Sequence, residues 1–123
     1  MTTSRFLTAV AVLYAIFGAA FVVAPDALMT LNGAPLNSGG VLLGRVLGAS
    51  LLGFALIYWS VKDHAREAVQ PMLYAGLVYN SIDIVVGYHA ITTGVMNSLA
   101  WGLVTLHVLL TLGFAYFAIA KAK

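Results

Sequence analysis

The chain has 123 residues, of which 62% are apolar and 8% are charged, and its mean hydropathy is +0.98. Soluble domains carry about 45–50% apolar and about 25% charged residues. The composition therefore excludes a soluble globular protein, a disordered chain and a protein that binds nucleic acid through basic patches, since a net charge of +2 is a weak field for phosphate. The absence of cysteine excludes disulfides, thiolate metal sites and cysteine nucleophiles.

In chain order, four segments are long and apolar enough to be membrane helices, which need about 20 mostly apolar residues. We expect these spans at residues 5–24, 40–61, 71–92 and 98–120. The connection between the third and fourth spans is short, so these two helices should be antiparallel neighbours. The sequence thus predicts an all-α fold, a single integral membrane domain over residues 1–123 built as a four-helix bundle.

Turn-forming residues delimit a short additional helix after the first span. Pro25 suits a first helical turn, and Asn32-Gly33 is a stop signal, so residues 25–31 should form a helix. Its residues Leu28, Met29 and Leu31 are expected at the lipid boundary, which makes this an interfacial helix. Pro71 similarly predicts the first turn of the third span.

Lysine and arginine outside the spans predict the orientation, because cytoplasmic loops of membrane proteins are enriched in them. The basic residues before the first span, in the second loop and after the fourth span are Arg5, Lys62, Arg66, Lys121 and Lys123. The first and third loops carry neither residue type. We therefore expect both termini in the cytoplasm of a multi-pass protein.

Small residues recur on one face of two spans, as they do where membrane helices pack closely. The second span repeats glycine every four residues, at Gly40, Gly44 and Gly48, and the third places Gly76 and Gly87 on a stripe with two polar residues. Such stripes predict helix packing. The contact is either within one chain or between the copies of a homo-oligomer.

Ionisable and polar residues inside the spans are the candidate functional site, because they are costly in lipid. At about 1.5 Å of rise per residue, Arg45, Asp83, Asn80 and His107 fall in one slab between the midplane and the outer half. The mid-span residue Tyr14 is expected to close or complete this pocket. Arg45 and Asp83 are predicted to pair, either as a structural link between the second and third spans or as part of a working site. In the alternative interpretation, Arg45 extends outward to the membrane surface and leaves Asp83 protonated.

The sequence predicts no metal site and no cofactor. A haem held by two histidines would need His89 and His107 at one depth, whereas they differ by about 8 Å along the membrane normal. Asp83 and these two histidines are not expected to bind a metal ion together, because the histidines lie at different depths. The absence of lysine inside the spans excludes a retinal Schiff base.

Several segments together resemble a family of small bacterial membrane proteins. They are Ala24-Pro25, the Leu-rich stretch to Asn32-Gly33-Ala34-Pro35, Gly44-Arg45-xx-Gly48 and the exit Trp59…Lys62-Asp63. The chain resembles loosely DoxX-like four-span proteins over nearly its whole length. This resemblance implies a four-helix bundle in a bacterial plasma membrane, and it supplies no catalytic residues.

Three functional hypotheses remain open. In the first, the polar pocket binds an apolar or anionic small molecule, with Arg45 as anchor, or handles protons through Asp83 and His107. In the second, the chain is a non-enzymatic accessory or scaffold subunit, its glycine stripes contact a membrane protein partner, and the Arg45–Asp83 pair is structural. In the third, it is a membrane enzyme acting on a lipid, quinone or isoprenoid. No catalytic signature favours the third hypothesis.

Overall fold

A computed structural model describes residues 1–119, and these are helical apart from short connections. The elements in chain order are α1 (Thr3–Val23), α2 (Pro25–Leu31), α3 (Ser38–Val61), α4 (Arg66–Thr92), the 3-10 turn η1 (Ser98–Ala100) and α5 (Trp101–Ile119). The all-α prediction is confirmed for this part of the chain, and the short helix after the first span has the predicted bounds. Residue 120, where we expect the fourth span to end, lies outside the described residues, as do Lys121 and Lys123.

Three segments are long and apolar enough to cross a membrane. They are Thr3–Val23, Ser38–Val61 and Ser98–Ile119. The fourth long helix, α4, has 27 residues but is less apolar, because polar side chains are spread along it. Three of the four predicted segments therefore have the length and apolar composition of a membrane span, while α4 meets only the length requirement.

Local capping explains where most helices begin and end. The side chains of Asn37 and Asn97 accept hydrogen bonds from the first amides of α3 and η1, which are otherwise unpaired. Gly33 and Gly94 follow α2 and α4 with φ angles of +81° and +77°, a left-handed conformation that glycine adopts without strain. These signals are local, so they can be recognised in the sequence.

The start of α4 differs from the prediction. The helix begins at Arg66, so Pro71 lies inside it rather than in its first turn. The guanidinium of Arg66 donates to the carbonyls of Phe117 and Ala118 at 3.1 and 2.7 Å. It thereby ties the start of α4 to the last described turn of α5. This tertiary contact accompanies the additional first turn of α4.

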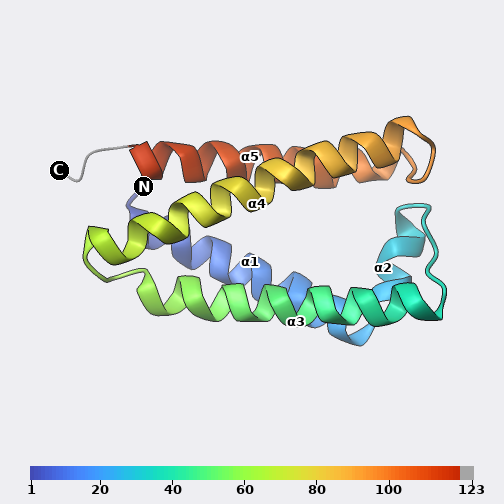
Figure 1. The fold of residues 1–123 in the computed structure, drawn as a ribbon, viewed down its shortest axis with the longest axis horizontal. Helices are drawn as coiled ribbons and strands as arrows, with labels where there is room; N and C mark the ends of the chain where they lie inside the picture. Colours follow the sequence, from blue (N-terminus) through green and yellow to red (C-terminus); the bar gives the residue numbers. More distant parts are fainter. Residues whose placement is uncertain (120–123) are drawn as a thin grey trace.

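The helices form two antiparallel hairpins, α1 with α3 and α4 with α5 (Figure 1). Contacts within each hairpin are extensive, whereas the hairpins touch each other at few backbone positions. In Figure 1 the hairpins approach each other where α1 begins and separate toward α2. We call the half near the start of α1 the closed half and the half near α2 the open half.

Glycines make the close contacts within the hairpins. A Cβ atom at Gly48 would lie 2.7 Å from the carbonyl oxygen of Gly18, so α1 and α3 meet backbone to backbone. Gly44 contacts Pro25, and in the second hairpin Gly76 receives the ring of Phe114. The predicted packing roles therefore agree with these placements.

The two remaining predicted glycines differ from each other. A Cβ atom at Gly87 would meet the Val104 side chain of α5 at 2.9 Å, which is a contact between helices. A Cβ atom at Gly40 would instead meet Leu36 and Asn37 of its own preceding loop. Gly40 is therefore not at a helix–helix contact, because it lies in the first turn of α3, where the connecting loop is the nearest neighbour.

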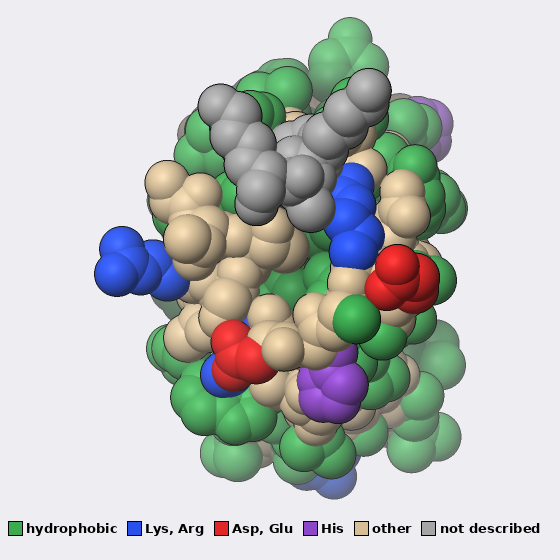
Figure 2. Space-filling model, turned by 90° about the vertical axis from the view of Figure 1, so that its left-hand side faces the viewer, with side chains coloured by type: hydrophobic (Ala, Val, Ile, Leu, Met, Phe, Trp, Pro, Cys, Tyr) green, Lys and Arg blue, Asp and Glu red, His purple; other side chains and the backbone are tan. Residues whose placement is uncertain are grey.

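Aromatic rings fill the closed half between the hairpins. Phe6 of α1 stacks on Phe117 and meets Phe114 edge to face, with centroids 4.9 and 5.0 Å apart. Tyr58 of α3 also contacts Phe114, which is fully buried. Side chains of three helices thus interlock here, and dispersion and area burial hold the hairpins together. Figure 2 looks onto this end and shows basic, acidic and histidine side chains gathered on it.

The outward faces of the helices are apolar. Large hydrophobic side chains are exposed along every long helix, among them Ile16 on α1, Leu56 on α3, Ile82 on α4 and Leu112 on α5. A monomer in water rarely exposes so much contiguous apolar surface. The surface therefore agrees with the apolar spans in favouring lipid as the surroundings.

Candidate functional site

Four of the predicted site residues meet where the closed half ends. The Asn80 amide nitrogen donates to the Tyr14 hydroxyl at 2.9 Å and to the Gly76 carbonyl at 2.8 Å. His107 Nδ1 lies 2.9 Å from Asn80 Oδ1, and His107 Nε2 lies 3.8 Å from Asp83 Oδ2. Helices α1, α4 and α5 each contribute to this polar layer, which we define as Tyr14, Asn80, Asp83 and His107.

The spacing on α4 explains why the polar layer faces inward. Residues four apart lie one above the other on a helix, so Asn80 stands one turn above Gly76 and shares its face. Asn80 is the only polar residue that is completely buried in the described part of the chain. A buried amide must be hydrogen-bonded to be tolerated, and its three partners satisfy it.

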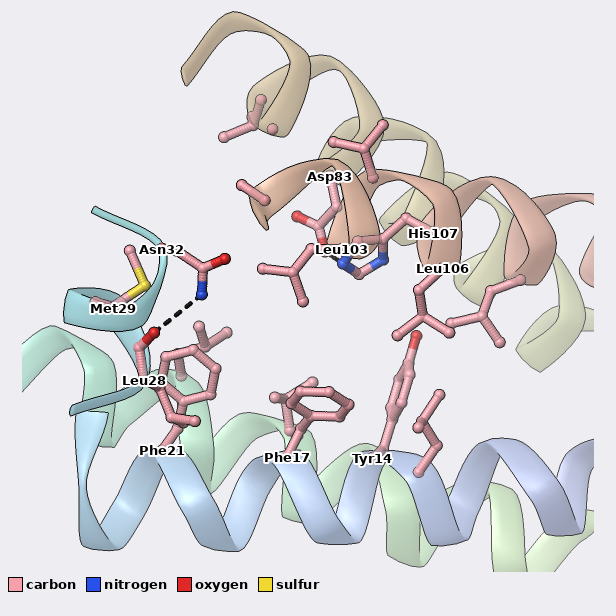
Figure 3. A pocket seen from close by; sticks show the side chains of 18 of the residues that line it. Tyr14, Phe17, Phe21, Leu28, Met29, Asn32, Asp83, Leu103, Leu106 and His107 are labelled. Carbon is pink, nitrogen blue, oxygen red and sulfur yellow. Dashed lines mark hydrogen bonds and ion pairs between the residues drawn. The ribbon is translucent and has the colours of Figure 1, made fainter. Parts of the chain in front are cut away.

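A cavity of about 330 Å³ opens beyond this layer, in the open half. Figure 3 shows Tyr14, Phe17 and Phe21 rising from α1 on one side, with Asp83 and His107 on the opposite side. Leucine, methionine and phenylalanine side chains make most of the wall. The cavity wall is therefore mostly apolar, and Asp83 and His107 place ionisable groups on it.

Arg45 is outside this site, and its predicted pairing with Asp83 is wrong. Arg45 is exposed, does not line the cavity and makes no ion pair within the described residues. The buried face of α3 contains Gly44 and Gly48, and Arg45 is turned about 100° from Gly44. In addition, α3 and α4 belong to different hairpins, and Asp83 lies beside His107 of α5 instead.

The short helix α2 also differs from its expected role. Leu28 and Met29 line the cavity rather than pointing only toward the surroundings, and Asn32 joins them (Figure 3). Leu31 is 63% exposed and alone keeps the predicted outward position. The helix packs across the mouth of the open half because Asn32 accepts from the amide of Asn97 at 2.8 Å.

Several cavity residues were missed by sequence reasoning. Phe17 and Phe21 lie in the apolar part of α1, and Tyr79 lies among apolar and polar residues of α4. A hydropathy pattern does not distinguish a side chain that faces a cavity from one that faces lipid. The nearest signal in the sequence is the position of Tyr79 beside Asn80, on the polar side of α4.

No clustered metal-ligand set is found within residues 1–119. No three histidine, aspartate or glutamate side chains converge there. His89 is exposed near the end of α4, while His107 faces the cavity from α5. The two histidines therefore do not approach each other as haem ligands would.

Comparison with known proteins gives no relative for this chain. No family model, curated protein or solved structure matches it. The functional argument therefore rests on the geometry of the polar layer and the cavity.

Proposed function

We propose that the chain is a four-span membrane protein that binds an apolar small molecule in the cavity of its open half. The single observation that carries the proposal is the cavity itself, about 330 Å³ with mostly apolar walls and a few polar side chains. Ligand sites are typically concave and mostly apolar, with a few polar groups that orient the ligand. The lipid bilayer surrounds the bundle and supplies apolar molecules from the side.

The direction of its side chains supports α4 as the fourth span. Its outward residues Val78, Ile82 and Val85 are all more than half exposed and apolar. Its polar residues Asn80 and Asp83 face the other hairpin and are hydrogen-bonded or lie at the cavity. Polar residues in membrane helices face the bundle interior in this way, so the modest hydropathy of α4 is compatible with a span.

The orientation follows from charge at the two ends. Arg5, Lys62 and Arg66 lie at the closed end, while the connections over 24–37 and 93–97 contain no lysine or arginine. The positive-inside rule then puts the closed end, with both termini, in the cytoplasm. We propose a bacterial plasma membrane, as the DoxX-like resemblance implies, so that the cavity lies in the outer half.

The orientation has a direct test, because the wild-type chain has no cysteine to interfere. Cysteines introduced at Ser38 and Val95, both exposed beyond the open half, should react with a membrane-impermeant thiol reagent in intact cells. A cysteine at His64 should react only after the cells are permeabilised. Labelling of His64→Cys in intact cells would reverse the proposed orientation.

The placement of Arg45 narrows the choice of ligand. An anionic ligand in the cavity would need a cation on its wall, and neither lysine nor arginine lies among the described lining residues. We therefore favour a molecule without negative charge. Proton handling by Asp83 and His107 remains compatible with the same site, and so does acid–base chemistry on a bound lipid, quinone or isoprenoid.

The accessory-subunit hypothesis loses its main sequence argument. Gly44, Gly48, Gly76 and Gly87 all contact neighbouring parts of the same chain. They are thus occupied within the bundle, and the stripe does not remain available for a partner or for a second copy. The pocket hypothesis is the one with a positive structural observation behind it.

The proposed function is tested by filling the cavity. Leu103 points into it (Figure 3), so Leu103→Trp should exclude a bound molecule. Leu109 on the same helix is 62% exposed, which makes Leu109→Trp the matched control. The protein is purified in native lipid, and copurified molecules are identified by mass spectrometry.

We expect one compound enriched over bulk lipid in the wild type and in Leu109→Trp, and at least about tenfold depleted in Leu103→Trp, the ratio for a lost contact worth about 1.4 kcal/mol. Equal amounts in both variants would contradict the proposal, because the compound would then bind elsewhere. Recovery of bulk lipid alone from all three proteins would contradict it as well.

A further inference from the structure

The hydrogen bonds around Asn80 determine which of its side-chain atoms faces His107. Nδ2 donates to the carbonyl of Gly76 and to the hydroxyl of Tyr14, which uses both of its hydrogens. The opposite orientation of the amide would set its oxygen 2.8 Å from the carbonyl oxygen of Gly76, two acceptors in contact. Oδ1 of Asn80 therefore faces His107 and can only accept.

His107 consequently donates from Nδ1, which lies 2.9 Å from Asn80 Oδ1. A neutral imidazole carries one hydrogen, so Nε2 is left as an acceptor. This nitrogen faces Oδ2 of Asp83 at 3.8 Å, which is too long for a direct hydrogen bond. Two acceptors thus face each other across a gap on the cavity wall, and their side chains are 23% and 30% exposed.

We propose that this pair of acceptors binds a protonated amine carried on an apolar body. The inference rests on the proposed pocket function and names the chemical class of its ligand. One nitrogen at a normal distance of about 2.9 Å from each acceptor bridges a gap of 3.8 Å. A primary or secondary ammonium has at least two N–H hydrogens, one for Asp83 and one for His107, whereas an alcohol has a single O–H hydrogen.

Charge and wall chemistry favour the same class. Asp83 is the only acidic residue on the cavity wall in the described part of the chain, and no lysine or arginine accompanies it there. The ammonium therefore meets a carboxylate and no competing fixed cation. Tyr14 and Tyr79 also line the cavity, and aromatic rings attract cations. The remaining apolar wall, with Phe17 and Phe21, contacts the body of the ligand.

The test uses three probes with one apolar body and different heads. They are 4-phenylbutylamine, 4-phenylbutan-1-ol and 4-phenylbutyltrimethylammonium, which offer a charged head with N–H donors, a neutral head with one donor and a charged head without donors. Binding to the protein in lipid nanodiscs is measured by calorimetry, and nanodiscs without protein give the partitioning background. We expect the amine to bind at least about tenfold more tightly than either of the others, since charge-assisted hydrogen bonds contribute about 1.5–3 kcal/mol each.

Variants assign the preference to the proposed atoms. Asp83→Asn replaces the carboxylate at nearly constant shape and should abolish the preference for the amine over the alcohol. Glu67→Gln removes an exposed acidic residue from the same helix and should retain the full preference. An unchanged preference in Asp83→Asn would overturn the proposal. A quaternary probe that matches the amine would overturn the two-acceptor arrangement.

The outcomes separate this inference from the pocket function on which it rests. Equal binding of amine and alcohol, both abolished by Leu103→Trp, would overturn the amine site and leave the pocket intact. Binding that Leu103→Trp does not change for any probe would count against the pocket itself.

The state of the imidazole provides an independent check. Nitrogen NMR of the ligand-free protein at neutral pH, with His107→Gln to assign the signal, should show Nδ1 protonated and Nε2 unprotonated. Addition of the amine should shift the Nε2 resonance. A doubly protonated imidazole in the ligand-free protein would overturn the proposal, because Nε2 would then already donate to Asp83.

Discussion

The closed and open halves of the molecule join the same two hairpins in different ways. In the closed half, Phe6, Tyr58 and Phe114 from three helices interlock, and Arg66 bonds the end of α5. In the open half, the connections are joined mainly at Asn32 and Asn97, and a cavity lies between the helices. The contrast indicates a division of roles, because the interlocked rings of the closed half provide packing contacts that the helices around a cavity do not make.

The largest expected effect tests this division with one substitution made in each half. Phe114 is fully buried among aromatic rings, so Phe114→Ala should cost about 3–5 kcal/mol of unfolding free energy. Phe21 already borders the cavity, and Phe21→Ala should cost less than half as much, since fewer contacts are lost. Equilibrium unfolding in detergent measures both. Equal losses would mean that the two halves contribute alike.

A second substitution tests how much the packing of α1 against α3 inside one hairpin contributes to the stability of the protein. Any Cβ atom at Gly48 would lie 2.7 Å from backbone atoms of Gly18 and Val22, which cannot move aside as side-chain ends do. Gly48→Leu should therefore cost about 1–3 kcal/mol or more. Gly53 on the same helix has open space around it, and Gly53→Leu is the matched control. Comparable unfolding curves for the two variants would show that Gly48 does not face α1.

The same glycines show how far the sequence could predict the fold. Helix positions, caps and the short helix follow from local residue patterns, and Gly44 and Gly48 correctly mark the buried face of α3. The direction of Arg45 could then also be predicted, because it lies about 100° around the helix axis from Gly44 and so points away from the buried face. Depth along the membrane normal places Arg45 and Asp83 in one slab, but depth does not contain the direction in which each side chain points, and the two residues face different directions.

Helix pairing explains the remaining difference between prediction and structure at the site. The third and fourth spans, α4 and α5, are neighbours as predicted, and α1 pairs with α3, but α3 and α4 belong to different hairpins and make few contacts. Asp83 therefore faces His107, and Asn80 connects His107 with Tyr14. Which side chains contact each other between helices depends on long-range packing, and a hydropathy pattern along the chain does not contain this information. The residue types at the polar layer were predictable, but their partners were not.

A smaller effect on the free energy of unfolding is expected at Thr111, which lies one helical turn after His107 at the boundary between the two halves. Its hydroxyl oxygen is buried and has no hydrogen-bond partner among the described residues. Thr111→Val keeps the shape and removes the unpaired group, so it should be neutral or stabilise the protein by up to about 1 kcal/mol. Thr105 on the same helix donates to the Trp101 carbonyl and is exposed, so Thr105→Val should bring no gain. Destabilisation by Thr111→Val in detergent unfolding would indicate that the hydroxyl is hydrogen-bonded.

The smallest expected effect lies at the surface of the closed half, where Asp63 accepts from Ser4 at 2.6 Å and pairs with Lys62. These hydrogen bonds, from Lys62 first and then Ser4, hold the pKa of Asp63 below its ordinary value. A carboxyl with a lowered folded-state pKa stabilises the protein above its unfolded-state pKa, and this contribution disappears as the pH falls through the folded-state pKa. Asp63→Asn should therefore lower the unfolding temperature slightly at pH 7, because the side chain is exposed and screened by solvent.

The pH dependence separates this contact from the aromatic packing beside it. Thermal unfolding of the wild type and Asp63→Asn should converge as the pH is lowered below about 4, near the ordinary pKa of aspartate. Ser4→Ala retains the pair with Lys62 and should lose a part of the stability over the same pH range. The loss of stability in Phe114→Ala involves no titrating group, so it should be the same at every pH. A difference between Asp63→Asn and the wild type that stays constant down to about pH 3 would contradict the role of the Asp63 carboxylate, and would leave the aromatic rings as the link between the hairpins at this end.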